Sequence, residues 1–185
     1  MKRVALLLAL PVAAQAHIMP GVGAFYSGML HAFLSPEQIL PLLALALLAA
    51  QTKKPSGWLI LFILPCAVLA GALYAPWSLH LSWVATLSLA VTAITGLLIA
   101  FAIPVPAVLA CLLSATAGLL AGWFNALDAG DASLLSGFGV ALSALLVLAY
   151  IAALTSRFLA SRLPIGIRIG GSWLAAIGIM TLALQ

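Results

Sequence analysis

Charged residues are scarce in this sequence. Its 185 residues include three Asp or Glu and seven Lys or Arg, so that only 5% of the chain is charged. A soluble domain carries about a quarter of its residues as charged side chains, which cover its surface. Water therefore cannot be the solvent for most of this protein's surface, and lipid takes its place.

The sequence also lacks the alternation of polar and apolar residues that marks the strands of a membrane barrel. Its apolar segments are long and unbroken, in a chain that is 66% hydrophobic. In lipid, backbone polar groups must be bonded within a helix or a closed barrel, and unbroken apolar segments favour the helix. We predict an all-α fold: a polytopic membrane helix bundle of about six transmembrane helices after an N-terminal signal peptide.

Few features support chemistry or soluble partners. No Ser/His pair, paired aspartates or H-E-x-x-H motif lies within the apolar segments, so we expect no enzyme. The net charge of +4 is spread thinly, so we expect no nucleic-acid partner. Two cysteines, Cys66 and Cys111, do not make a disulfide framework. The remaining partners are the lipid bilayer, a second copy of the chain or another membrane protein.

The first sixteen residues have the three parts of a secretory signal peptide. The chain starts with Lys2 and Arg3, continues with an apolar stretch over residues 4–14, and reaches an A-x-A cleavage site at 14–16. The apolar stretch is too short to span a bilayer. We expect cleavage after residue 16, which leaves His17 as the first mature residue; an uncleaved anchor is the alternative.

Residues 17–185 are expected to form a single transmembrane domain, in which Pro, Gly and rare polar clusters separate the apolar segments. The first segment is short, so residues 22–34 are predicted to form a helical lead-in that bends at Pro36. The spans are predicted near residues 37–51, 57–74, 83–101, 105–124, 134–155 and 168–184.

The positive residues predict the orientation of these spans. Cytoplasmic loops of membrane proteins carry an excess of Lys and Arg. With the mature N-terminus outside, the inner loops are 52–56, 102–104 and 156–167. These loops or their edges contain all the mature cations: Lys53, Lys54, Arg157, Arg162 and Arg168.

The acids and histidines gather at the opposite, outer face. They are Glu37, Asp128, Asp131, His17, His31 and His80. Imidazole and carboxylate groups are donors that nickel and cobalt favour. A straight helix would place His31 and Glu37 on different faces, but the break at Pro36 could bring them together. His17 adds its imidazole and, as the mature N-terminus, its amine.

Each of these groups also has a purely structural interpretation. His31 can bond a carbonyl at the helix break. Glu37 lies in a first helical turn, where the helix dipole favours a carboxylate, with Ser35 as candidate N-cap. Asp128 and Asp131 can solvate an outer loop, from which they could also approach the other donors.

Small residues recur at helical spacing. Gly118 and Gly122 are four apart in one apolar segment, and Gly166, Gly170 and Gly171 are closely spaced near the last one. Such spacing lets helix backbones approach closely in lipid. We therefore interpret these glycines as packing residues without chemistry.

Residues 23–51, GAFYSGMLHAFLSPEQILPLLALALLAAQ, resemble the first signature of the HupE/UreJ family of small nickel/cobalt permease-like membrane proteins. The family pattern runs roughly G-F-x-x-G-h-x-H-P-x-x-G-x-D-H-L-L-A-M-x-A-x-G-L-h-A-A, where h is apolar. A signal peptide followed at once by histidine, and six spans, are similar to the family's layout over the whole chain. The matching positions are Phe25, Gly28, His31, Leu40, Ala44, Leu47, Ala49 and Ala50.

The chain departs from this pattern at expected metal-site positions. The family's H-P is His31-Ala32 here, and its D-H is Glu37-Gln38. The family's second, histidine-rich signature should fall near 118–130, where this chain reads GLLAGWFNALDAG.

The resemblance implies a permease of the bacterial inner membrane, with nickel, cobalt or another small solute as cargo and no further cofactor. Its metal site would comprise His31, Glu37 and His17 at the outer face. The departures leave an alternative open: a non-transporting membrane accessory or assembly protein derived from the same family.

Overall fold

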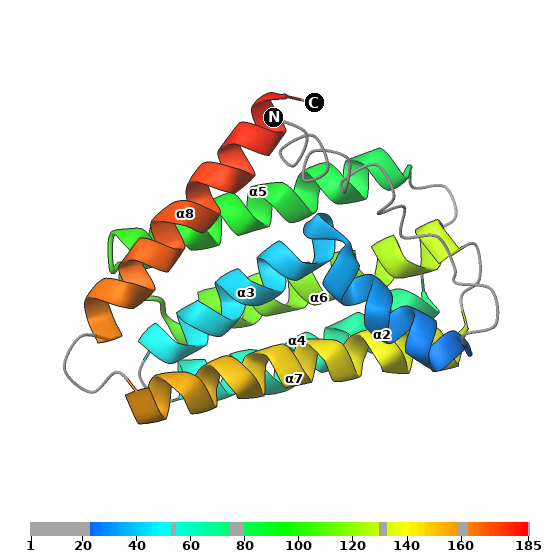
Figure 1. The fold of residues 1–185 in the computed structure, drawn as a ribbon, viewed down its shortest axis with the longest axis horizontal. Coiled ribbons are helices and arrows are strands. Elements are labelled where there is room, and N and C mark those ends of the chain that lie inside the picture. The colour runs from blue at the N-terminus through cyan, green and yellow to red at the C-terminus, as the bar shows by residue number, and fades with distance from the viewer. Residues whose placement is uncertain (1–22, 53–54, 75–79, 130–132, 159–162, 185) are drawn as a thin grey trace, which may run out of the picture.

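The chain is helical throughout the part that the structure describes. The computed structural model describes residues 23–52, 55–74, 80–129, 133–158 and 163–184, and within these ranges it contains seven α-helices and no strand (Figure 1). They are α2 (Ala24–Leu34), α3 (Pro36–Gln51), α4 (Ser56–Leu73), α5 (Leu81–Ala100), α6 (Ala107–Ala129), α7 (Leu134–Phe158) and α8 (Leu163–Ala183). The predicted all-α, polytopic membrane bundle is confirmed. The predicted signal peptide, 1–16, and His17 lie outside the described residues.

Five helices, α4 to α8, are long and apolar enough to cross a membrane. Helix α3 has only 16 residues, and it joins α2 through a bend of 74°, so the bent pair counts as a sixth candidate span. The largest extensions beyond the expected spans, of five residues each, are at the end of α6 and the start of α8. Helix α6 continues to Ala129 and α8 begins at Leu163, so Asp128 and Arg168, which were expected in or beside loops, both lie within helices.

The bend follows from the Ser35-Pro36 dipeptide. Pro36 has no N–H to continue α2, and a residue before proline is disfavoured in the helical region. Ser35 is accordingly extended, with φ −92° and ψ 114°, and its N–H donates to the His31 carbonyl at 3.0 Å, which closes α2. Pro36 then occupies the first turn of α3. The helical lead-in expected from the sequence is present, with its break one residue before Pro36.

Helices α3 and α6 lie in the middle of the bundle, between the α5–α8 pair and the α4–α7 pair, while α2 crosses over α7 (Figure 1). The central position of α3 is reflected in its burial, since Leu42, Leu45 and Leu48 are all at most 1% exposed. Large apolar side chains on the outer helices are exposed instead, as expected of a surface that faces lipid.

Glycines set the closest helix contacts. A Cβ at Gly118 would lie 2.7 Å from the Leu64 carbonyl oxygen, and one at Gly122 would lie 2.5 Å from the Ala72 nitrogen. Both positions therefore press α6 against α4, which confirms the packing interpretation. Gly171 likewise meets Ile99 of α5, but a Cβ at Gly166 would meet nothing within 4 Å, so the packing interpretation was wrong there.

Replacing Gly122 by alanine should destabilise the protein. The added methyl group would strike the backbone of α4, and overpacking of this kind costs about 1–3 kcal/mol. The measurement is thermal unfolding of the full chain in detergent, followed by loss of helical circular dichroism. Gly166→Ala is the matched control and should be neutral or slightly stabilising, because alanine favours a helix over glycine by about 1 kcal/mol. Equal midpoints for the two variants would contradict the close contact.

Candidate functional site

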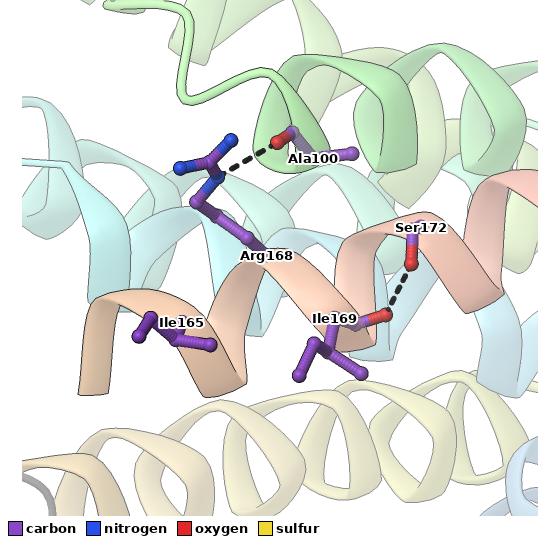
Figure 2. A pocket seen from close by; sticks show the side chains of 5 residues that line it. All are labelled: Ala100, Ile165, Arg168, Ile169 and Ser172. Carbon is purple, nitrogen blue, oxygen red and sulfur yellow. Dashed lines mark hydrogen bonds between the residues drawn. The ribbon is translucent and has the colours of Figure 1, made fainter. Parts of the chain in front are cut away.

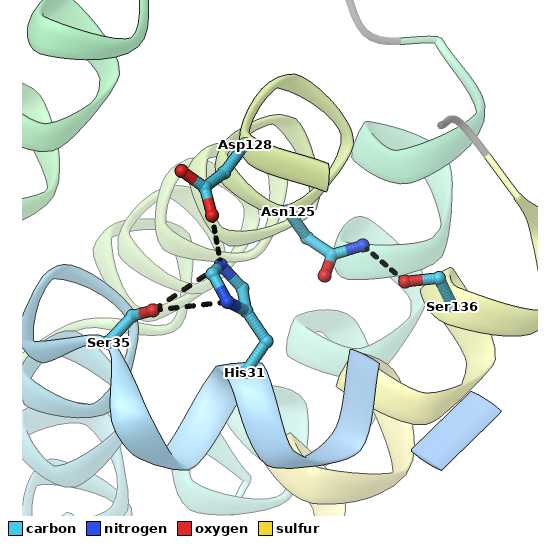
Figure 3. A network of polar contacts seen from close by, with 5 residues as sticks. All are labelled: His31, Ser35, Asn125, Asp128 and Ser136. Atoms are coloured by element: carbon cyan, nitrogen blue, oxygen red, sulfur yellow. Dashed lines mark hydrogen bonds and ion pairs between the residues drawn. The ribbon is translucent and has the colours of Figure 1, made fainter. Parts of the chain in front are cut away.

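A buried histidine lies at the break between α2 and α3. His31, in the last turn of α2, is 9% exposed, and its ring stacks on Phe124 of α6 with centroids 5.9 Å apart. The Nε2 atom lies 3.4 Å from Oδ2 of Asp128 (Figure 3). The imidazole thus has an apolar face against α6 and a polar edge directed at a carboxylate.

Asp128 occupies an intrinsically unfavourable position for an acid. It lies in the last turn of α6, where the free carbonyls give the helix end a negative partial charge. Its side chain is only 26% exposed. A carboxylate placed there gains from a cationic neighbour, which a protonated His31 or a bound cation can provide.

The hydroxyl of Ser35 approaches the same ring. Its Oγ lies 3.3 Å from Nε2 and 3.5 Å from Nδ1 of His31. Ser35 holds the N-cap position of α3, as the sequence predicted, but its side chain makes no capping bond. Both contacts are long for a hydroxyl hydrogen bond. Ser35 therefore binds the ring of His31 only weakly.

A second polar contact fixes α6 against α7 beside this pair. The Nδ2–H of Asn125 donates to Ser136 Oγ at 2.9 Å, and both residues are buried (Figure 3). Ser136 also meets α2, because a Cβ at Gly28 would lie 2.8 Å from its Oγ. Two helical turns further along α7, the Ser143 hydroxyl donates to the Met29 carbonyl at 3.0 Å. These contacts hold α2, and hence His31, in place.

The first turn of α3 carries a buried amide without a partner. Gln38 is 0% exposed, and neither its Nε2 nor its Oε1 bonds to another described residue. Buried polar groups are nearly always hydrogen-bonded, and one left unpaired costs about 1–3 kcal/mol. The Gln38 amide is therefore a destabilising group beside the helix break, and it is available to bond a ligand or a water.

The predicted donor set assembles only in part. Glu37 lies half-buried in the first turn of α3 and forms no hydrogen bond or ion pair with a described residue. His80 is exposed at the N-cap of α5. His17 and Asp131 lie outside the described residues. In the described part of the chain, no three His, Cys, Asp or Glu side chains are grouped closely enough to hold a metal ion.

Asp128, rather than Glu37, is therefore the acid that meets His31. The sequence contained a signal for this arrangement. No Gly or Pro follows Gly122 until Gly130, so the helical pattern could have been extended through Asp128. The extension places Asp128 four residues after Phe124, on the same helix face. That face is the one on which His31 stacks.

Comparison with known proteins gives one match. The model of a family described as HupE / UreJ protein matches residues 4–181. The match covers nearly the whole chain, including the α2–α3 break and the end of α6. No curated protein and no solved structure matches the chain.

Substituting Gln38 by methionine should stabilise the protein. Methionine has a similar shape but no buried amide to desolvate, so the unfolding free energy is expected to rise by about 1–3 kcal/mol. Thermal unfolding in detergent measures the change. Gln51→Met, at the other end of α3, is the matched control with a smaller expected effect, since Oε1 is the only atom of the half-buried Gln51 amide that is itself buried without a partner. A lower midpoint for Gln38→Met would show that the amide has a bonding partner after all.

Proposed function

The chain belongs to the HupE/UreJ family, and from this membership we propose that it is a membrane permease for a divalent transition-metal ion, nickel or cobalt. The ion is captured at the outer end of the bundle, between His31 and Asp128. The observation that carries the proposal is the 3.4 Å approach of the His31 Nε2 and the Asp128 Oδ2 at a helix break.

The chemistry of the pair suits such a cargo. Imidazole nitrogen and carboxylate oxygen are favoured donors for first-row divalent ions. Two adjacent ligands that are each about 2.1 Å from one ion lie about 3.0–3.4 Å apart, by simple geometry from typical bond lengths. The Nε2–Oδ2 distance of 3.4 Å falls in that range. A cation between the two groups would also compensate the negative charge of the Asp128 carboxylate, which is unfavourable at the C-terminal end of α6.

The location of the pair supports transport as well. Ionisable residues inside membrane bundles are rare and mark ion pathways, and broken helices form the substrate sites of many transporters. Here the break at Ser35 and Pro36 lies beside the pair. Two protein donors leave the other coordination positions of the ion to water, which suits a site that must release its cargo.

Three further residues are assigned supporting roles. Gln38 stands where the family pattern has histidine, and its unpaired amide can bond the water that the ion carries. Glu37, in the first turn of α3, and His17, as the mature N-terminal residue, would attract the cation to the outer mouth.

The other end of α3 meets a cavity of about 540 Å³. Its lining includes Gln51, Thr52 and Ser56, together with residues 102–105. The Oε1 atom of Gln51 is buried without a bonding partner among the described residues. The central helix thus carries an incompletely bonded amide at each end, which supports α3 as the element along which the ion passes.

Metal binding by the purified full chain in detergent tests the capture site. We expect His31→Ala and Asp128→Asn to weaken nickel or cobalt binding at least tenfold, because each removes one of two protein donors. Glu37→Gln should have a smaller effect. His80→Ala is the matched control, since it removes an exposed histidine elsewhere. Isothermal titration measures the affinity, and wild-type affinity in the His31 and Asp128 variants would exclude this site.

Transport itself is tested by uptake of nickel into proteoliposomes that contain the full chain. Wild-type vesicles should accumulate the ion, and Asp128→Asn vesicles should take up at least tenfold less. Protein that binds nickel as described but moves none of it would contradict a permease. That outcome would favour the accessory or assembly role instead.

A further inference from the structure

A cationic crevice lies between the end of α5 and the second turn of α8. It is a shallow, open depression of about 260 Å³, lined by Ala100, Ile165, Arg168, Ile169 and Ser172 (Figure 2). Among the residues whose side chains the structure describes, Arg168 is the only Lys or Arg. The crevice lies where α5 ends and α8 begins, at the end of the bundle away from α2 (Figure 1).

Arg168 donates one hydrogen bond to a backbone carbonyl at the end of α5. Three of the last carbonyls of this helix accept bonds from the following turn: Leu97 from Phe101 N–H, Ile99 from Ala102 N–H, and Leu98 from Ile103 N–H. Ala102 adopts a positive φ of 52° to make that turn. The Ala100 carbonyl accepts instead from the Nε–H of Arg168 at 2.9 Å. This bond holds the guanidinium at the mouth of the crevice.

The remaining donors of Arg168 are free to bind a ligand. A guanidinium has five N–H donors, and the Nε–H is the one that bonds within the described part of the chain. Arg168 forms no ion pair with a described acid. The two terminal nitrogens point away from Ala100 (Figure 2). A planar pair of N–H groups in this arrangement matches the oxygens of a phosphate.

The apolar walls of the crevice indicate which kind of anionic ligand fits it. Ile165 and Ile169 flank Arg168 and are 64% and 50% exposed, on a helix that is apolar enough to cross a membrane. A ligand here must present an anionic group to Arg168 and hydrocarbon to the two isoleucines. An anionic phospholipid has both parts, whereas a free anion has only the first. Basic pockets between transmembrane helices on the cytoplasmic side bind such headgroups.

We propose that this crevice binds one anionic phospholipid of the inner leaflet, with Arg168 bonding the headgroup phosphate and Ile165 and Ile169 contacting an acyl chain. The predicted orientation agrees, because the C-terminal ends of α3 and α7, which lead into the predicted cytoplasmic loops 52–56 and 156–167, lie at this end of the bundle (Figure 1). The bound lipid would stabilise the contact between α5 and α8. This proposal is independent of the metal site.

The decisive variant is Arg168→Gln. The glutamine Nε2 stands at the same chain position as the arginine Nε, so it can still donate to the Ala100 carbonyl while the positive charge is lost. Arg168→Lys retains the charge but loses the planar pair of donors. Lys53→Gln removes one charge from the loop 52–56 and serves as the control for non-specific attraction.

The experiment is native mass spectrometry of the delipidated full chain, titrated with phosphatidylglycerol or with zwitterionic phosphatidylcholine. We expect wild-type protein to bind one phosphatidylglycerol in preference to phosphatidylcholine. Arg168→Gln should weaken this binding about fivefold or more, Arg168→Lys should weaken it less, and Lys53→Gln should leave it unchanged. A thermal unfolding midpoint of Arg168→Gln equal to wild type in lipid-free detergent shows that the variant is folded.

Three outcomes would overturn the proposal. They are equal binding of the two lipids, equal binding by wild type and Arg168→Gln, and a loss in Lys53→Gln as large as that in Arg168→Gln. A competition experiment with inorganic phosphate distinguishes a lipid headgroup from free phosphate as the ligand of Arg168. If millimolar phosphate displaces the lipid completely, the acyl chain contributes nothing and the lipid assignment is wrong.

Discussion

In lipid, every backbone N–H and C=O group needs a hydrogen-bond partner within the protein. This constraint is hardest to meet at the break between Ser35 and Pro36, where the helical bonding is interrupted. Pro36 ends α2, and Pro41, inside α3, has no N–H to offer the Glu37 carbonyl. Such a break is tolerable only when protein covers it. Here α2 is held on α7 by the close approach of Gly28 to Ser136 and by the Ser143–Met29 bond.

The same covering contacts create the candidate site. Because α2 lies against α6 and α7 rather than in line with α3, the ring of His31 reaches Phe124 and Asp128. A straight helix would direct His31 elsewhere in the bundle. The bend therefore has two effects. Neighbouring helices cover the interrupted backbone, and one of them, α6, brings Asp128 to the imidazole of His31.

Much of this architecture could be predicted from the sequence, since long apolar segments in a chain with 5% charge allow little but a helical membrane bundle. His31 was identified from its motif and from the nearby proline. The pairing with Asp128 was weighed only as a loop approach, because a turn was expected soon after residue 124, whereas α6 continues to Ala129. The absence of Gly and Pro over residues 123–129 permits the longer helix, but the sequence does not show the partner that Asp128 meets there. The unpaired state of Gln38 is likewise a property of the packed bundle, invisible in the sequence.

The shortness of α3 has a consequence for the electric work of moving an ion. Its 16 residues rise about 24 Å, whereas the hydrocarbon core of a bilayer is about 30 Å thick. In a membrane-inserted bundle, a cation seated at the start of α3 would have passed roughly a fifth of the dielectric barrier, by the ratio of those two lengths. If water reaches that seat, the membrane potential drops over the shorter remaining distance. The field along α3 would then be steeper than in the surrounding lipid, and a negative interior would draw the divalent charge inward through it.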